Sequence, residues 1–184
     1  MCIRDRTLLV TSLEQHLNDL VSAIENTGIL VDDVMASPLA ASLVMLSKTQ
    51  KRAGCVLANI GAETVSIAVF ENSIPISLKV FPLGSGDITN DIAIGLKIPL
   101  EEAERVKRGF TSNTNISKRK LDEIISARLS DMFGLIEAHL KSIKRNGLLP
   151  AGIIITGGGS GIADIEDLAK SLSLIHISEP TRPY

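Results

Sequence analysis

The sequence predicts an α/β fold on three observations. Residues 55–81 contain three β-branched runs separated by short turns, the pattern of an antiparallel meander. A further apolar run at 152–156 leads through a glycine-rich turn into a helical pattern. Between these strands, residues 121–143 carry a one-sided apolar stripe that spans about six helical turns. The parts show no sequence repeat. The length of 184 residues is ample for one packed core and marginal for two, so one domain, or one piece of a larger domain, is expected.

Composition narrows the function classes. The chain has 184 residues, 45% of them hydrophobic, and a formal net charge of −2. We expect no nucleic-acid partner, because this charge leaves no large basic face and only 3% of the residues are aromatic. Cys2 and Cys55 are too few for a disulfide framework or a cysteine metal site. No apolar run approaches the roughly 20 residues that cross a bilayer, so we expect a cytoplasmic protein.

The first residues of the globular part predict a helix and a strand. Apolar residues recur with helical spacing over 13–24, Ser12 and Gln15 fit a capping box, and Gly28 would end the helix. A short strand is expected at 31–35.

A second helix is predicted just before the meander. Ser37 precedes a proline and would cap a helix over 39–46. Residues 47–54 are predicted to be a polar, basic connector.

The meander consists of strands at 55–60, 65–70 and 74–81, with turns at 61–64 and 71–73. Both faces of the second strand are largely apolar or small, so the sheet is expected to be covered on both sides.

The remaining elements follow from caps and periodicity. Asp87 and Ser117 are placed to cap helices, and Gly147 would stop the long one. The stripe on this long helix could seat a partner helix or pack into the core, and core packing is favoured. The predicted elements are helices at 88–96, 99–108, 121–143 and 162–172, a polar loop at 111–117, and a buried strand at 152–156.

Two glycine turns could carry chemistry. Strands that reverse as tightly as those around Gly61 and Thr64 can aim backbone N–H groups at a phosphate, although such turns also occur as plain connections. The turn at 157–161 lets the backbone approach a ligand closely, and it too could be only a tight connection. Ile162 occupies the sixth position of the dinucleotide pattern, which disfavours a Rossmann site.

The run from 54 to 107, especially GSGDITNDIAIGLKIPLEEAERVK, resembles the bacterial cell-division actin homologue FtsA. Upstream, ASPLAASLVML resembles the family's helix before the phosphate hairpin, and downstream PAGIIITGGGSGIADIEDLA resembles its adenosine turn. This resemblance covers residues 11–172. It implies an actin-like ATPase (ribonuclease H-like) fold, present in part as a β-meander plus helices, the second lobe of the nucleotide-binding core.

The resemblance also implies a division of the chain. Residues 7–52 would form the end of the first lobe and a connecting helix, and 53–172 the second lobe with the phosphate hairpin and the adenosine turn. The ends MCIRDR (1–6) and SLIHISEPTRPY (173–184) resemble translated sequencing-adapter sequence, so we expect both true ends of the protein to be missing.

The family's second phosphate loop usually reads DIGGGTTD, and residues 59–66 read NIGAETVS. Among the positions implied to bind nucleotide, Gly61 and Thr64 keep the family's residue types, whereas Ala62 stands where the family has glycine. Asn59 replaces an aspartate that helps to hold Mg²⁺ through water, Glu63 replaces a second glycine, and Ser66 replaces the last aspartate. An amide is a poorer ligand for Mg²⁺ than a carboxylate. ATP and Mg²⁺ are the implied cofactors, no catalytic residue is identified, and hydrolysis is expected to be weak at most.

The nucleoside would lie between a helix and the second glycine turn. Glu104 and Lys107 share one helix face and could reach a ribose or adenine, as related ATPases use a Glu and a Lys at this spacing. The alternative is a set of surface pairs, Glu101 with Arg105 and Glu104 with Arg108. In the turn itself, the implied adenosine contacts are Gly157, Gly158, Gly159 and Ser160.

By this resemblance the chain is predicted to be part of an ATP-binding actin homologue of the divisome. It would form polymers with itself and link FtsZ filaments to the inner face of the cell membrane at the division site, through a C-terminal amphipathic helix that this chain does not contain. Two alternatives are a PilM-like pilus-assembly protein and a nucleotide-independent scaffold.

The three histidines, which lack metal-ligand spacing, are expected at the surface or its boundary: His16, His139 and His176.

Overall fold

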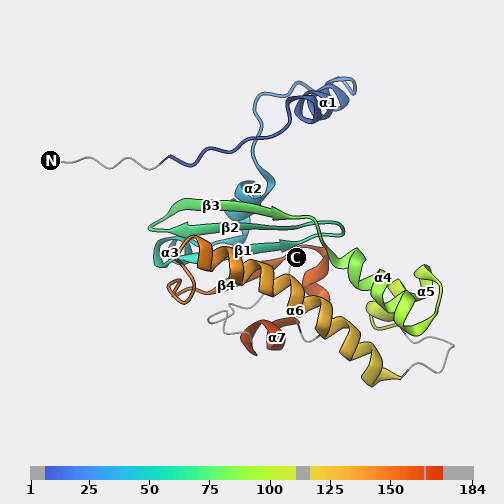
Figure 1. Ribbon diagram of the computed structural model, residues 1–184. Helices are drawn as coiled ribbons and strands as arrows, with labels where there is room; N and C mark the ends of the chain where they lie inside the picture. The colour runs from blue at the N-terminus through green and yellow to red at the C-terminus, as the bar shows by residue number, and fades with distance from the viewer. Residues whose placement is uncertain (1–6, 111–116, 164, 172–184) are drawn as a thin grey trace.

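The computed structural model describes residues 7–110, 117–163 and 165–171. Its centre is one four-stranded sheet in the order β3-β2-β1-β4 (Figure 1). The strands are β1 (Cys55–Ile60), β2 (Val65–Glu71), β3 (Ile74–Phe81) and β4 (Ile153–Thr156). The first three form the predicted antiparallel meander, and β4 pairs with β1 in parallel. The α/β prediction is confirmed.

Helices cover both faces of the sheet. Side chains alternate along β1, so that Val56 and Ala58 join one apolar cluster and Leu57 joins the other. The first cluster is completed by α6 (Lys118–Ser142), whose predicted stripe packs against it, with the middle of the stripe buried and its ends at Leu121 and Ile143 partly buried. The second is completed by residues from α2 (Ser37–Met45) and by Leu46. The prediction of a sheet covered on both sides is confirmed.

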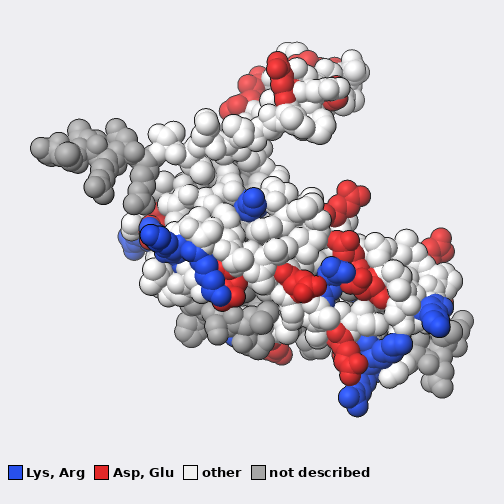
Figure 2. All heavy atoms as spheres, in the orientation of Figure 1, with Lys and Arg blue, Asp and Glu red and all other residues white. Residues whose placement is uncertain are grey.

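Two helices extend beyond one end of the sheet, α4 (Ser85–Leu96) and α5 (Leu100–Lys107) (Figure 1). A bidentate ion pair joins α4 to α6, with Nε and Nη2 of Arg128 at 2.6 and 2.9 Å from the carboxylate oxygens of Asp91. Two parallel N–H···O bonds fix orientation as well as distance. The pair therefore holds α4 at a defined angle to the long helix. Figure 2 shows acidic and basic side chains side by side over this end of the molecule.

The first helix, α1 (Glu14–Glu25), stands apart from the sheet and buries none of its residues (Figure 1). The predicted capping box at its start is wrong, because Leu13 occupies the N-cap and no side chain caps the helix. The strand predicted at 31–35 is also absent. A strand needs a hydrogen-bonding neighbour, and within the described residues this segment has none. Here Val34 N–H donates to Asp33 Oδ1 at 2.7 Å instead.

The connector predicted at 47–54 is a helix, α3 (Lys48–Ala53). It begins with a reciprocal capping box, in which Ser47 Oγ accepts from Gln50 N–H and Gln50 Oε1 accepts from Ser47 N–H. The helix α2 begins at Ser37, one residue after its N-cap Ala36, so the predicted cap lies inside the helix.

Two further caps differ from prediction. Asp87 lies within α4, where its Oδ2 accepts from Gly84 N–H at 2.8 Å. At the end of α6, Lys144 takes the left-handed conformation and Arg145 N–H bonds back to Leu140 O at 2.8 Å. This is a Schellman ending, so Gly147 is not the stop. Ser117 does occupy the N-cap of α6, although its side chain makes no capping bond.

After β4 the chain forms a 3₁₀ helix, η1 (Gly158–Gly161), before α7 (Ile165–Ser171). This turn delays the start of α7 relative to the predicted 162. Residues 111–116 of the loop expected at 111–117, Asp164 and Leu172 of the helix expected at 162–172, and the two end segments at 1–6 and 173–184 lie outside the described residues. Within the described part of the chain, no helix is both long and apolar enough to cross a membrane.

Candidate functional site

The tip of the β1–β2 hairpin is held by the start of α4. The carbonyl oxygens of Gly61 and Ala62 accept hydrogen bonds from the N–H groups of Ser85 and Gly86, both at 2.8 Å. The first N–H groups of a helix have no partner inside it. Here the hairpin supplies those partners, so the position of one element determines the position of the other.

This contact requires glycine at the helix start. A Cβ on Gly84 would overlap the carbonyl group of Ala62. The backbone of Gly84 is extended, so close approach rather than its backbone conformation explains the residue.

The second glycine turn packs against β1 from the other side. A Cβ on Gly157 would overlap Oδ1 of Asn59, and a Cβ on Gly159 would overlap the side chain of Ile60. In contrast, Gly158 and Gly161 have no neighbouring atom within 4 Å of an added Cβ. The turn thus has two glycines that permit packing and two that border open space.

A cavity of about 530 Å³ lies between these elements. The hairpin tip, the start of α4, one face of α5 and the glycine turn border this cavity. Its lining residues are Ala62, Ser85, Gly86, Glu104, Lys107, Arg108, Gly158, Gly159, Gly161 and Ile162.

Half of the predicted site residues line this cavity. They are Ala62, Glu104, Lys107, Gly158 and Gly159. The other half lie outside the lining: Asn59, Gly61, Thr64, Gly157 and Ser160. Of these, Ser160 turns its hydroxyl to the Gly157 carbonyl at 2.7 Å and so closes the turn. The binding roles of all ten residues stay predictions.

Sequence reasoning missed the contribution of α4 and the end of the glycine turn. Ser85, Gly86 and Gly161 line the cavity but were not predicted. The segment GSGD was a visible signal, because small residues at a helix start allow close backbone contact. Which element they contact depends on the tertiary fold, which local pattern does not specify.

Charged groups on α5 form a compact network with α4. Glu104 Oε2 lies 2.6 Å from Lys107 Nζ and accepts from the Thr89 hydroxyl, also at 2.6 Å. Its Oε1 accepts from Arg108 Nε at 2.8 Å. Both features considered from sequence are therefore present, the shared face of Glu104 and Lys107 and the surface pair of Glu104 with Arg108.

The network changes the acidity of Glu104. Burial alone would raise the pKa of this carboxyl, but hydrogen bonds from Lys107, Thr89 and Arg108 stabilise the carboxylate and lower its pKa to about 2. Glu104 therefore stays ionised at all physiological pH values and is paired with two cations, Lys107 and Arg108.

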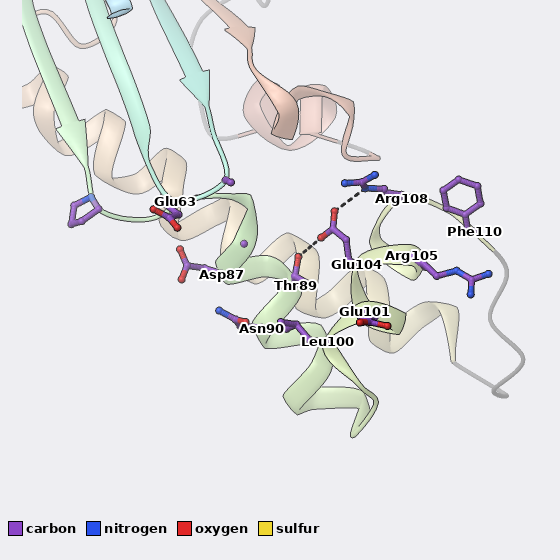
Figure 3. Close-up of a pocket in the computed structure, with 13 residues that line it drawn as sticks. Glu63, Asp87, Thr89, Asn90, Leu100, Glu101, Glu104, Arg105, Arg108 and Phe110 are labelled. Carbon is purple, nitrogen blue, oxygen red and sulfur yellow. Dashed lines mark hydrogen bonds and ion pairs between the residues drawn. The ribbon is translucent and has the colours of Figure 1, made fainter. Parts of the chain in front are cut away.

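A second cavity of about 740 Å³ adjoins the first, and Ala62, Gly86, Glu104 and Arg108 line both. Figure 3 shows Glu63 and Asp87 at one end and Arg108 with Phe110 at the other. Glu104 lies between them, joined to Thr89 and Arg108.

His139 lies at the boundary of the core, as predicted. Its Nε2 is 2.8 Å from Ser77 Oγ, and its ring meets Phe81 edge-on. Burial lowers the pKa of His139, and the nearby charge of Lys79 lowers it further. His16 is exposed, and His176 lies outside the described residues.

The sequence profile described as "Cell division protein FtsA" matches residues 56–183. The chain belongs to the FtsA family. Similar relatives are the cell division protein FtsA of Bacillus subtilis, 32% identical over 89% of this chain and 42% of the relative, and that of Neisseria meningitidis, 29% identical over 91% and 46%. The chain thus spans less than half the length of these FtsA proteins.

Solved structures place this FtsA-family chain in the actin-like fold. MreB5 of Spiroplasma citri bound to AMPPNP superposes with a TM-score of 0.78 at 16% identity, over 91% of this chain and 60% of the other. The ethanolamine utilization protein EutJ of Carboxydothermus hydrogenoformans gives 0.72 at 19% identity, over 94% and 58%. A PilM–PilN pilus biogenesis complex gives 0.70 at 21% identity, over 88% and 46%. These likenesses confirm the predicted fold.

The site fits the cofactors of an actin-like ATPase unevenly. On the nucleoside side, Gly158 and Gly161 border open space, and a backbone without Cβ atoms lets a ligand approach closely. A magnesium site fits poorly at the hairpin, because the amide of Asn59 has no negative charge and is a poorer ligand for Mg²⁺ than a carboxylate.

Gly84→Ala is expected to destabilise the protein by about 1–3 kcal/mol, because its Cβ must displace the hairpin carbonyl. Gly134→Ala, on the exposed face of α6 with open space around it, is the matched control and should stabilise by about 0.5–1 kcal/mol. Urea unfolding measures both. A Gly84→Ala protein as stable as the wild type would contradict the close contact.

Glu104→Gln is expected to change the acid dependence of stability. The pKa of Glu104 is lowered from 4.5 to about 2, so its stabilisation is present above pH 4.5 and is lost as the pH falls through about 2. The unfolding temperatures of wild type and variant should therefore converge in this window. Glu101→Gln, an exposed carboxyl on the same helix, serves as control, and parallel curves for Glu104→Gln would contradict the network.

Proposed function

We propose that this chain forms the nucleoside-binding part of an ATP site in an actin-like cell-division protein. The observation that best supports this proposal is the cavity of about 530 Å³. Glu104 and Lys107 of α5 line one side of it, and the glycine turn lines the other, with open space beside Gly158 and Gly161. Membership of the FtsA family supports this assignment. Glu104 and Lys107 would contact the ribose or base, and the backbone of the turn would lie against the base.

The phosphate side of the proposed site is weaker. Asn59, Glu63 and Ser66 stand where the family pattern has an aspartate, a glycine and an aspartate. Glu63 also adds negative charge near the position of a phosphate. We therefore expect binding to depend on the nucleoside and any hydrolysis of ATP to be weak.

The wider role follows from family membership alone. The whole protein would polymerise with itself and join FtsZ filaments to the inner face of the cell membrane at the division site, with a C-terminal amphipathic helix as the membrane contact. Because this chain covers 42–46% of the similar FtsA relatives, these are roles of the longer protein.

A nucleotide-independent scaffold is the second candidate. The altered hairpin favours it, and so does Lys107, whose ammonium group already has two hydrogen-bond acceptors and an ion-pair partner within the protein. A pilus-assembly role is less favoured, because the likeness to the PilM complex is one of fold at 21% identity, whereas the matching family is that of cell division.

Gly158→Val in the full-length protein is expected to lower the affinity for ATP at least about tenfold, because the side chain enters the open edge of the cavity. Isothermal titration measures the affinity, and Gly134→Ala on the distant face of α6 should bind as the wild type does. Thermal unfolding without nucleotide should be unchanged. Equal ATP affinity in wild type and Gly158→Val would contradict this site, and no ATP binding by the wild type would favour the scaffold.

Asn59→Asp should make ATP binding depend on Mg²⁺. The wild type is expected to bind ATP similarly in Mg²⁺ and in EDTA, and the variant several-fold more tightly in Mg²⁺, since it regains a carboxylate. Asn90→Asp, the same exchange at an exposed position of the second cavity, is the control. An unchanged response to Mg²⁺ in Asn59→Asp would show that the hairpin substitution does not limit metal binding.

A further inference from the structure

One residue of α4 touches both ends of the proposed site through its backbone. The N–H of Ser85 donates to the hairpin carbonyl of Gly61 at 2.8 Å. The carbonyl of Ser85 accepts from Lys107 Nζ at 3.0 Å. The hairpin and the α5 lysine are thus separated by a single residue.

Thr89, one helical turn later, meets the same lysine. Its side chain is buried, and its hydroxyl accepts from Lys107 Nζ at 2.7 Å. The single hydroxyl proton can go to Glu104 Oε2 at 2.6 Å or to the Ser85 carbonyl at 3.3 Å. The shorter, charged acceptor is the stronger partner, so Thr89 orders Lys107 and Glu104 together.

Three oxygens lie within 3.0 Å of the ammonium nitrogen of Lys107, two as hydrogen-bond acceptors and one as an ion-pair partner. An ammonium group has three N–H donors, and the three oxygens are Ser85 O, Thr89 Oγ1 and Glu104 Oε2. The side chain is only 7% exposed. A ligand oxygen that binds Lys107 must therefore replace one acceptor, and the neutral carbonyl of Ser85 has the longest bond of the three.

We propose that Ser85 and Thr89 couple the nucleoside end of the site to the hairpin. This inference rests on the proposed nucleotide site and adds its internal regulation. A hydroxyl oxygen of the ligand replaces Ser85 O as an acceptor of the hydrogen bond from Lys107 Nζ. Without that bond, Ser85 is held less firmly, and its hydrogen bond to Gly61 weakens. Thr89 is the positioning residue. Its hydroxyl oxygen accepts an N–H of Lys107 that would otherwise be available to the ligand, so the ligand must displace Ser85 O instead.

The coupling must work in both directions. If a nucleoside at Lys107 weakens the bond between Ser85 and Gly61, then a change that frees the hairpin must strengthen nucleoside binding by the same factor. The element with two arrangements is Lys107 itself, bonded either to Ser85 or to the ligand.

Thr89→Val separates coupling from binding. The variant keeps the shape of the side chain but removes the acceptor, so that Lys107 has a spare proton and can bind a ligand oxygen without leaving Ser85 O. Adenosine is the probe, because it has no phosphate that could touch the hairpin directly. Hydrogen exchange of the Ser85 and Gly86 amides reports on their bonds to the hairpin.

In the full-length wild type, saturating adenosine is expected to speed the exchange of these amides about fivefold or more. Direct contact with the ligand would slow exchange instead. Thr89→Val should bind adenosine but show no acceleration, and Thr89→Ser, which keeps the hydroxyl, should restore it. Thr27→Val is the matched control and should behave as the wild type, since it removes an exposed threonine hydroxyl that bonds to the Ile24 carbonyl.

Acceleration of equal size in wild type and Thr89→Val would overturn the proposal. The proposal would also be overturned if the wild type bound adenosine without faster exchange of these amides, although the nucleoside site itself would then stand. This second outcome is measured on the wild type alone and does not depend on the folding of a variant. If the wild type bound neither adenosine nor ATP, the proposed function would fail and the coupling with it.

Discussion

The site depends on two hydrogen bonds between the hairpin and α4. Ser85 and Gly86 donate to the carbonyls of Gly61 and Ala62, and this leaves no room for a side chain at Gly84. Because α5 follows α4 and is tied to it by Thr89, the positions of Glu104 and Lys107 follow from the same contact. If the hairpin moved, the acid–base pair would move with it.

Parallel pairing explains why distant segments meet at this site. Asn59 on β1 pairs with Thr156 on β4, and both strands run in the same direction. Their carboxyl ends therefore emerge at one edge of the sheet, where ligands of open α/β sheets bind. The hairpin leaves one strand and the glycine turn leaves the other, which places Ala62 and Gly158 around the same cavity.

The sequence predicted those elements that depend on local residue patterns, and it did not predict those features that depend on contacts between distant segments. The three strands of the meander were correct because β-branched runs and turn residues are local signals. The strand expected at 31–35 failed because a strand also needs a neighbour. The helix α3 was overlooked because its polar residues show no apolar stripe, although Ser47 and Gln50 gave the signal of a capping box. Local pattern thus predicted the α/β class, and the family resemblance added the actin-like fold and half of the cavity lining, whereas Ser85 and Thr89 acquire their contacts with Lys107 only when α4 meets α5.

The two halves of the site differ in how charge can contribute to binding. On α5, Glu104 is paired with both Lys107 and Arg108, so this end presents no uncompensated negative charge to a nucleoside. At the hairpin, Asn59 has no negative charge to offer a metal, and Glu63 would repel a phosphate placed beside it. Affinity would then come mainly from contacts with the base and ribose, which ATP and ADP share. A site of this kind discriminates weakly between the two nucleotides by direct contact. A response to bound nucleotide would therefore have to pass from the nucleoside end of the site to the hairpin. The hydrogen bonds of Lys107 to Ser85 and Thr89 of α4 connect these two ends.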